Sequence, residues 1–336
     1  MTQNHPPLPT GSWQHELATA FTTIDDLCRF LELDPRLLPV SEQAAERFAL
    51  KVPRGFAARM QKNNPHDPLL LQVLPLTNET AAYPGFSDDP VGDLAAAAEQ
   101  SILHKYRGRV LMINTGTCAI NCRYCFRRNF PYGDYQLGRQ KQNQALDYIR
   151  NDTTISEVIL SGGDPLLLGD TRLSELIEQL DAIEHLTRLR IHSRLPIVLP
   201  SRITDELLTI LKKSRLLATV VVHCNHANEI DAAVEKACRK LKNGGIMLFN
   251  QAVLLKHIND NAVELCRLSE TLYRNGIVPY YLHSLDKANG TGHFLVPEAE
   301  ALTLYETLQR HLPGYLVPKL VRETAGKPYK EIIGST

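Results

Sequence analysis

The chain has 336 residues, of which 43% are hydrophobic and 22% are charged, and these fractions are ordinary for a globular protein. Its 37 basic residues equal its 37 acidic residues, so no net charge attracts it to nucleic acid or to an anionic membrane surface. The odd number of cysteines, seven, and the absence of long apolar runs argue against a secreted disulfide framework and against a transmembrane protein.

Residues 1–103 are the first of three predicted regions. Residues 1–10 are polar and rich in proline, without the apolar core of a signal peptide, so we expect a cytoplasmic protein with no membrane or nucleic-acid partner. Helical spacing of apolar residues predicts short helices at 25–33 and 42–50. No pattern in this region indicates chemistry. We expect it to be mainly helical and to pack against the rest of the chain.

Residues 104–312 alternate between strand-like and helix-like segments. Short apolar or β-branched runs predict six strands, at 109–114, 157–161, 188–193, 218–223, 246–253 and 278–283. Helical patterns fill the intervals, at 142–150, 172–184, 204–213, 229–242, 262–274 and 298–311. Successive strand–helix units favour parallel strands with helices outside. We interpret this α/β pattern as an open, partial (β/α)6 barrel, with a flatter doubly wound sheet as the alternative.

Three cysteines follow the first predicted strand. Cys118, Cys122 and Cys125 have the spacing C-x3-C-x2-C, with the aromatic Tyr124 directly before the last of them. Three thiolates this close together can bind three irons of a [4Fe–4S] cluster and leave the fourth iron open to a small molecule. In barrels of this kind ligands bind at the carboxyl ends of the strands, which is where these cysteines lie.

Polar residues also end the other predicted strands. Gly162, Gly163 and Asp164 follow the second strand, and adjacent glycines let the backbone approach a ligand closely. Because apolar residues would be the more favourable filling, polar residues at successive strand ends indicate a binding site. His223 and His226 follow the fourth strand, and with the cysteines they keep open a second interpretation, a zinc-binding interaction module.

With these segments in place, the sequence resembles the lysine 2,3-aminomutase family of radical S-adenosylmethionine (SAM) enzymes. The resemblance extends from about residue 104 to residue 330 and rests on runs that include HKYRGRVLMINTGTCAINCRYCFRR, LSGGDPLLL, RIHSRLPIVLPSRIT, VVHCNHANEI and PYYLHSLDKANGTGHF. It implies a partial barrel of radical SAM type that uses a [4Fe–4S] cluster, SAM and pyridoxal 5′-phosphate (PLP). The implied isomerase reaction converts L-lysine to β-lysine.

The resemblance also implies roles for individual residues. Arg127 corresponds to an arginine that binds the substrate carboxylate, and a guanidinium fork suits that group. Asp286 and Glu323 correspond to two acids that bind the distal ammonium of lysine. Lys330, seven residues after Glu323, corresponds to the lysine that anchors PLP, and residues 313–336 form the third region that carries it. Lys327 is the alternative anchor.

Further residues are expected to contact cofactors. Three of them match positions at PLP or its phosphate, and the Gly-Gly-acidic run matches the segment that binds the methionine amino group of SAM. The complete set is Lys105, Tyr106, Arg109, Tyr124, Gly162, Gly163, Asp164, His223 and Gln251.

The resemblance also implies partners for the protein. They are an electron donor such as flavodoxin or ferredoxin, a second copy of the chain in a homo-oligomer, and a pathway that supplies (R)-β-lysine to elongation factor P through its ligase. Two enzymatic alternatives remain open at this point: a PLP-dependent radical SAM aminomutase for another amino acid, and a radical SAM enzyme without PLP.

Overall fold

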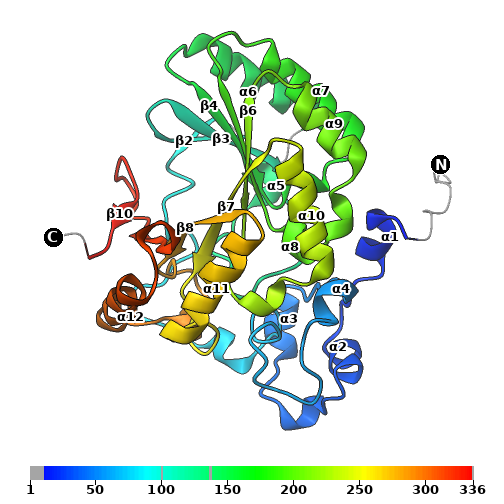
Figure 1. The fold of residues 1–336 in the computed structure, drawn as a ribbon, viewed down its shortest axis with the longest axis vertical. Coiled ribbons are helices and arrows are strands. Elements are labelled where there is room, and N and C mark those ends of the chain that lie inside the picture. The colour runs from blue at the N-terminus through cyan, green and yellow to red at the C-terminus, as the bar shows by residue number, and fades with distance from the viewer. Residues whose placement is uncertain (1–10, 100, 136–137, 335–336) are drawn as a thin grey trace.

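The computed structural model describes residues 11–99, 101–135 and 138–334 (Figure 1). The polar segment at residues 1–10 and the last two residues of the predicted C-terminal segment lie outside the described residues. Within the described part of the chain, each helix is too short or too polar to cross a lipid bilayer.

One open sheet forms the frame of the molecule (Figure 1). In the described residues its strands lie side by side in chain order: β1 (Ala97–Glu99), β2 (Ile102–Tyr106), β3 (Arg109–Thr115), β4 (Glu157–Gly162), β5 (Arg188–Ser193), β6 (Leu217–Val222), β7 (Met247–Val253), β8 (Ile277–His283), β9 (Lys319–Arg322) and β10 (Glu331–Ile332). Neighbours from β3 to β9 are parallel, and the pairs at the two edges are antiparallel. The predicted partial barrel is confirmed.

The six predicted strands correspond to β3–β8, and each observed boundary lies within one residue of the predicted one. The parallel sheet continues one strand further than predicted, because β9 pairs in parallel with β8. This strand has only four residues, so its apolar pattern is too short to distinguish it from a loop.

Long helices cover the outer face of the sheet. They are α6 (Arg139–Asn151), α7 (Asp170–Asp181), α9 (Asp205–Lys213), α10 (Ala232–Asn243), α11 (Ala262–Arg274) and α12 (Glu298–His311). Each buries an apolar stripe at helical spacing, as α7 does with Leu173, Leu176, Ile177 and Leu180. The short helices α5 (Tyr132–Tyr135) and α8 (Leu195–Val198) belong to the loops after β3 and β5.

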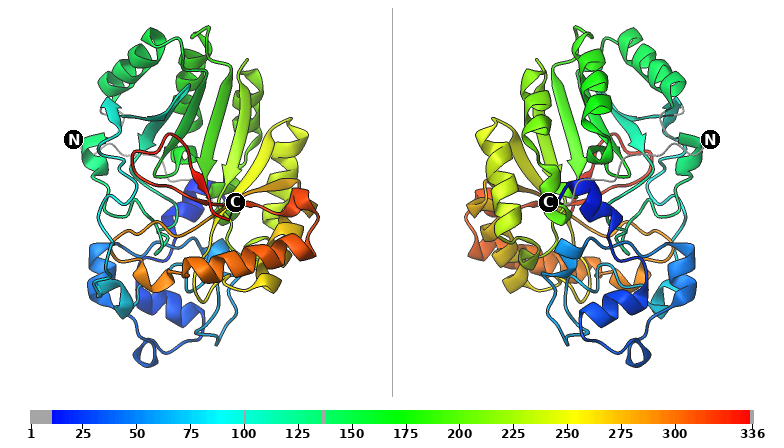
Figure 2. Two further views of the ribbon diagram at one scale, coloured as in Figure 1. Left: turned by 90° about the vertical axis from the view of Figure 1, so that its left-hand side faces the viewer. Right: turned by 90° about the vertical axis from the view of Figure 1, so that its right-hand side faces the viewer.

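The N-terminal region packs below the end of the sheet toward which the parallel strands run (Figures 1 and 2). It contains α1 (Trp13–Ala18), α2 (Ile24–Phe30), α3 (Glu42–Arg47) and α4 (Arg54–Ala57). The helices α2 and α3 are the predicted ones, and each ends three residues earlier than expected. Buried residues of this region, such as Leu27 and Phe56, belong to the same hydrophobic core as the barrel.

The C-terminal segment crosses the open side of the sheet (Figure 2). After β9 the chain turns and returns as β10, and between these strands lie residues 323–330. An ion pair of 2.9 Å joins Lys105 Nζ on β2 to Glu323 Oε1 after β9. This contact connects one side of the open sheet to the other.

Candidate active site

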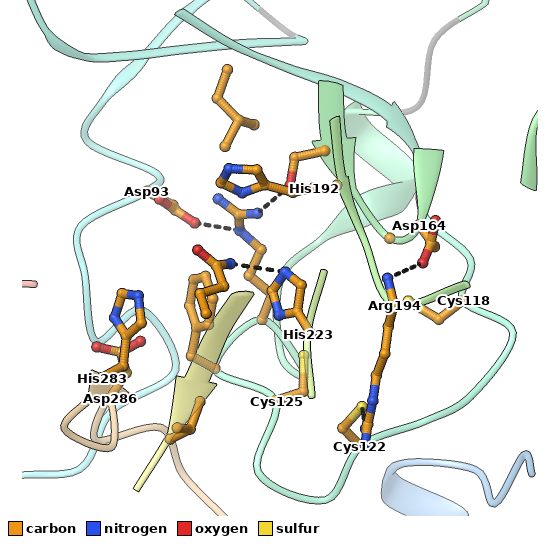
Figure 3. A pocket seen from close by; sticks show the side chains of 18 of the residues that line it. Asp93, Cys118, Cys122, Cys125, Asp164, His192, Arg194, His223, His283 and Asp286 are labelled. Carbon is orange, nitrogen blue, oxygen red and sulfur yellow. Dashed lines mark hydrogen bonds and ion pairs between the residues drawn. The ribbon is translucent and has the colours of Figure 1, made fainter. Parts of the chain in front are cut away.

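A cavity of about 630 Å³ opens at the carboxyl ends of the parallel strands. All sixteen residues to which the sequence analysis assigns a role line it, from Lys105 on β2 to Lys330 before β10. Figure 3 shows the three cysteines on one side of this cavity and Asp286 on the other. The fold therefore brings together residues that are distributed over most of the chain.

The cysteine loop after β3 is held by the N-terminal region. Lys51 Nζ donates to the Cys118 carbonyl oxygen at 2.9 Å. The backbone N–H of Asn121 donates to the Lys51 carbonyl, and that of Arg123 donates to the Gln72 carbonyl. These hydrogen bonds fix the loop at both ends of the Cys118–Cys122 interval.

A cluster of buried charged side chains also joins the cysteine loop to the N-terminal region. Arg123, which is fully buried, and Arg128 both pair with the Glu79 carboxylate, with shortest N–O distances of 2.5 and 2.8 Å. Glu79 lies in the N-terminal region, in a turn of 3-10 helix. The Glu79 carboxylate is paired on both of its sides, and the remaining guanidinium donors are taken by backbone carbonyl oxygens, such as those of Ala44 and Gly290. The cluster can therefore rigidify the loop, and its net charge is positive.

The three cysteine side chains are free thiols that face the cavity. Burial and the neighbouring Cys125 and Asp164 raise the pKa of the Cys118 thiol, and burial together with Cys122 raises the pKa of Cys125 to about 11. Three thiolates here therefore repel one another unless cations compensate them. Among the described residues no three His, Cys, Asp or Glu side chains are grouped closely enough to hold a single metal ion. In an iron–sulfur cluster each thiolate binds a different iron, so the sulfurs need not share one point.

The two glycines at the end of β4, Gly162 and Gly163, are required by close backbone packing. A Cβ atom on Gly162, whose φ is +115°, would lie 2.6 Å from the Thr115 carbonyl oxygen. A Cβ atom on Gly163 would lie 2.2 Å from the carbonyl oxygen of Thr117. The observed close contacts are with the backbone that leads into the cysteine loop, and the predicted approach of these glycines to a ligand stays a prediction.

Asp164 uses its carboxylate within the protein. Oδ2 accepts from the backbone N–H groups of Arg194 and Leu195, while Oδ1 accepts from Leu166 N and from Ser193 Oγ at 2.7 Å. Burial raises the pKa of this carboxyl to about 6, although the four hydrogen bonds oppose that shift. Asp164 thus joins the end of β4 to the end of β5.

A chain of alternating charges crosses the cavity wall. Asp93 pairs with Arg127 Nε at 2.7 Å and with Lys105 Nζ at 2.6 Å. Lys105 also pairs with Glu323, whose other oxygen contacts Lys330 Nζ. Although burial acts to raise it, Lys330 and Lys105 lower the pKa of Glu323 to about 2, so this carboxylate is charged.

Asp286 differs from Glu323 both in its partners and in the direction of its pKa shift. It follows β8 and faces the cavity, and among the described residues it forms no ion pair. Burial and the nearby Glu323 raise the pKa of Asp286 to about 7, against the opposing effect of Lys330. At neutral pH Glu323 is therefore charged, whereas the Asp286 carboxyl titrates close to neutrality.

Three histidines, of which His283 is buried and His192 and His223 are half-buried, face the cavity as neutral rings. Burial, Arg194 and Arg127 lower the pKa of His223 to about 3, and burial also keeps the pKa values of His192 and His283 well below their usual range. His223 Nε2 lies 2.8 Å from the Gln251 side-chain nitrogen, which can donate to it. Among the described residues, Nε2 of His192 and Nε2 of His283 have no hydrogen-bond partner.

The remaining predicted residues form aromatic and cationic walls of the cavity. The Arg109 guanidinium lies 4.6 Å from the centre of the Tyr106 ring, so these two residues form one surface. Tyr124 is buried, with its ring edge-on to Phe294 at 6.4 Å between centroids. Its hydroxyl has no hydrogen-bond partner among the described residues.

Two residues that were considered as alternatives lie outside this arrangement. The side chain of Lys327 is 54% exposed, with its Nζ 3.9 Å from Glu331. His226 Nε2 pairs with Glu264 at 2.9 Å, and its Nδ1 accepts from the backbone N–H of Asn228. Both ring nitrogens of His226 are therefore engaged away from the cysteines, which contradicts the proposed zinc set.

We predicted no site residue in residues 1–103, but this region does contribute to the cavity lining. Asp93, in a turn before β1, reaches the cavity and pairs with Arg127. No periodic pattern marks this aspartate, because a turn has no regular spacing. Arg194 was also missed as a site residue, although its position directly after a predicted strand is the signal that could have identified it.

Comparisons with known proteins show which proteins the chain is similar to. Residues 112–268 match the model of the Radical SAM superfamily. The chain is 46% identical over 319 residues to the L-lysine 2,3-aminomutase of Escherichia coli, covering 95% of this chain and 93% of that protein. It is 47% identical over 321 residues to the protein of the same name from Haemophilus influenzae, covering 96% and 95%. The solved structure of SuiB from Streptococcus suis is 15% identical with a TM-score of 0.48, covering 67% of this chain and 51% of that one.

Proposed function

Because the chain belongs to the lysine 2,3-aminomutase family of radical SAM enzymes, we propose that it converts L-lysine to β-lysine in the cavity at the carboxyl ends of β3–β9. The enzyme is an isomerase that uses a [4Fe–4S] cluster, SAM and PLP. One observation carries the proposal: a single cavity is lined by three cysteines, a lysine amine, and charged groups suited to both ends of a lysine molecule.

The residues present fit the cofactors. We propose that Cys118, Cys122 and Cys125 bind the cluster, since cationic iron would relieve the repulsion among three half-buried thiolates. Lys330 offers the primary amine to which PLP attaches, and Tyr106 with Arg109 offers a hydroxyl and a cation for its phosphate. When bound, the cluster and SAM supply radical chemistry, and PLP supplies the electron system over which an amino group can migrate.

The substrate carboxylate is assigned to Arg127. Asp93 holds the Nε edge of this guanidinium, so the other edge keeps its donors for a ligand, with Ser161 Oγ as a distant contact at 3.4 Å. A planar fork fixed by a buried carboxylate binds another carboxylate with defined orientation. Arg127 would thereby fix the reacting end of lysine in the cavity.

The distal ammonium of lysine is assigned to Asp286 and Glu323. Both acids line the cavity, and in the absence of substrate Glu323 is neutralised by Lys330 and Lys105. Glu323 would exchange its contact with Lys330 for the substrate ammonium and keep its pairing with Lys105. The two acids, the ligand ammonium and Lys105 together form a compensated buried set.

The other predicted residues are assigned supporting roles. Tyr124, His223 and Gln251 would contact SAM, together with the backbone of Gly162 and Gly163. The Asp164 carboxylate is occupied by protein donors, so its part in cofactor binding is to fix the strand ends. Lys105 links Asp93 to Glu323 and would adjoin the PLP phosphate.

We also propose the organisation and partners of the enzyme. Residues 1–103 would clamp the cysteine loop, residues 104–312 would form the catalytic barrel, and residues 313–336 would carry the PLP lysine. The product would be (R)-β-lysine for the ligase of elongation factor P, formed by a homo-oligomer that flavodoxin or ferredoxin reduces. Free thiols at the described cysteines suit the reducing cytoplasm.

The test is anaerobic turnover by the fully loaded protein. Protein reconstituted with iron, sulfide and PLP is incubated with SAM, a reductant and L-lysine, and the product is separated by chiral chromatography. We expect about four iron atoms per chain and β-lysine in the R form. Production of a β-amino acid only from another substrate would favour the related aminomutase. A loaded protein that produces none would contradict the proposal.

A further inference from the structure

Arg194 directs its guanidinium at a sulfur atom of the cysteine loop. It follows β5, and its backbone N–H donates to Asp164 Oδ2 at 2.7 Å. From there the side chain extends across the cavity wall to Cys122, where Nη1 lies 2.6 Å from Sγ (Figure 3). None of the roles assigned above uses this contact.

The position of the Arg194 side chain is fixed by buried neighbours. Nη2 donates to Gln72 Oε1 at 2.7 Å and to Glu229 Oε2 at 2.9 Å. The guanidinium also lies 5.6 Å from the centre of the Tyr124 ring and 5.4 Å from that of Phe56. Only 7% of the residue is exposed, so water does not compete for these contacts. The N–H group that faces Cys122 is therefore held in a single orientation.

We propose that Arg194 is a positioning residue that raises the reduction potential of the cluster by donating a hydrogen bond to the Cys122 sulfur. Reduction transfers one electron from the donor to the cluster, with no bond made or broken, and increases the negative charge on the sulfur ligands. A donor N–H stabilises that charge more in the reduced state than in the oxidised state, and hydrogen bonds to sulfur are a recognised determinant of cluster potential.

Glu229 limits the long-range effect that the charge of Arg194 has on the reduction potential of the cluster. Its carboxylate pairs with Arg194, so the net charge of the two groups is close to zero and the long-range electrostatic effect on the cluster is small. The short-range N–H to sulfur contact remains, because Nη1 and Nη2 have different partners. The potential should therefore depend on this donor, and less on the total charge of the pair.

The experiment is a redox titration of the reconstituted cluster, followed by electron paramagnetic resonance, with and without SAM. It rests on the proposed function, because it requires a cluster on the three cysteines. Arg194→Gln is compared with wild type, and we expect its potential to be lower by at least a tenfold change in the one-electron equilibrium, about 59 mV. Resonance Raman spectra in D2O should show a solvent-isotope shift of an iron–thiolate band in wild type that the variant lacks.

Arg202→Gln is the matched control. Arg202 is also a fully buried arginine in the segment after β5, but it donates to the carbonyl oxygens of Leu166 and Leu168 and pairs with Asp170. Its loss should destabilise the protein and leave the cluster potential unchanged.

A second variant addresses the unpaired carboxylate that Arg194→Gln leaves behind. Arg194→Gln/Glu229→Gln removes both charges, and we expect the same lowering of the potential. Unchanged potentials in both variants, with full iron content, would overturn the proposal, as would weaker SAM binding without a change in potential. Wild-type protein that cannot hold a [4Fe–4S] cluster would overturn the proposed function and this inference together.

Discussion

At the scale of single residues, Lys330 and Lys327 differ in what surrounds their amino groups. This difference predicts which of the two lysines anchors PLP. Lys330 contacts Glu323 inside the cavity, whereas Lys327 is largely exposed. Lys330→Ala should abolish covalent PLP labelling after borohydride reduction, because the linkage needs a primary amine at the site. Peptide mass spectrometry measures the label. Lys327→Ala is the matched control and should retain it; the opposite pattern would identify Lys327 as the anchor.

Asp286 determines substrate choice in this account. Removal of its charge leaves a buried lysine ammonium with one acid in place of two, and loss of one partner from a buried ionic set costs about 3–5 kcal/mol. We expect Asp286→Asn to reduce lysine turnover by about a hundredfold or more. Turnover is measured as anaerobic β-lysine formation, with iron and PLP content determined on the same preparation. Normal turnover would exclude the proposed ammonium site, and loss of iron or PLP would indicate a structural role.

The titration of Asp286 predicts how lysine binding depends on pH. Its pKa is raised to about 7 by burial and Glu323, while Lys330 and Lys105 oppose the shift and Asp93 adds to it. A bound ammonium favours the carboxylate, so binding below that pKa must release a proton, and affinity should weaken as pH falls below about 7. Calorimetry in two buffers of different ionisation enthalpy measures the release.

The same measurement on Asp286→Asn is the control for this pH dependence. We expect the variant to lose the proton release near pH 7. Asp164, whose pKa is raised to about 6, accepts hydrogen bonds from Ser193 and backbone N–H groups and is not among the groups that act on Asp286. Proton uptake on binding, or an unchanged pH profile in the variant, would contradict the assignment of the titration to Asp286.

At the scale of elements, the end of β4 and the cysteine loop are packed backbone against backbone. A methyl group on Gly163 would meet the Thr117 carbonyl at 2.2 Å, so Gly163→Ala must displace the residues that lead into Cys118. We expect about 1–3 kcal/mol of destabilisation and loss of bound iron. Thermal unfolding and iron analysis measure both quantities.

Gly169→Ala is the control for the glycine prediction. Gly169 precedes α7 at a φ of −63°, and a Cβ atom there would meet nothing within 4 Å. This variant should change the free energy of unfolding by less than about 0.5 kcal/mol and should keep its iron. Equal free energies of unfolding and equal iron contents in the two variants would show that the close packing at Gly163 contributes neither to stability nor to iron binding.

The elements were predictable where the sequence has a regular period. The strands β3–β8 and the long helices have alternating or helical apolar patterns, and the helix boundaries agree within three residues. The strand β9 was not predicted, because four residues are too few to establish a period. The cysteine site and the C-terminal lysine were predicted from spacing and resemblance, whereas Asp93 was missed because it lies in an irregular turn.

At the scale of the whole molecule, the three predicted regions depend on one another. The N-terminal region supplies Glu79 and Lys51 to the cysteine loop, and the C-terminal segment supplies Glu323 to Lys105 on β2. The cavity is therefore closed by contacts between segments far apart in sequence. Such contacts arise only in the folded chain, so local sequence patterns cannot predict them.

The central claim is that one cavity holds the cluster, SAM, PLP and lysine at the same time. A crystal structure of the loaded protein with lysine, with anomalous diffraction at the iron edge, tests it most directly. We predict iron density at Cys118, Cys122 and Cys125, and lysine with its carboxylate at Arg127 and its ammonium between Asp286 and Glu323. Iron bound elsewhere, or lysine bound outside this cavity, would contradict the account.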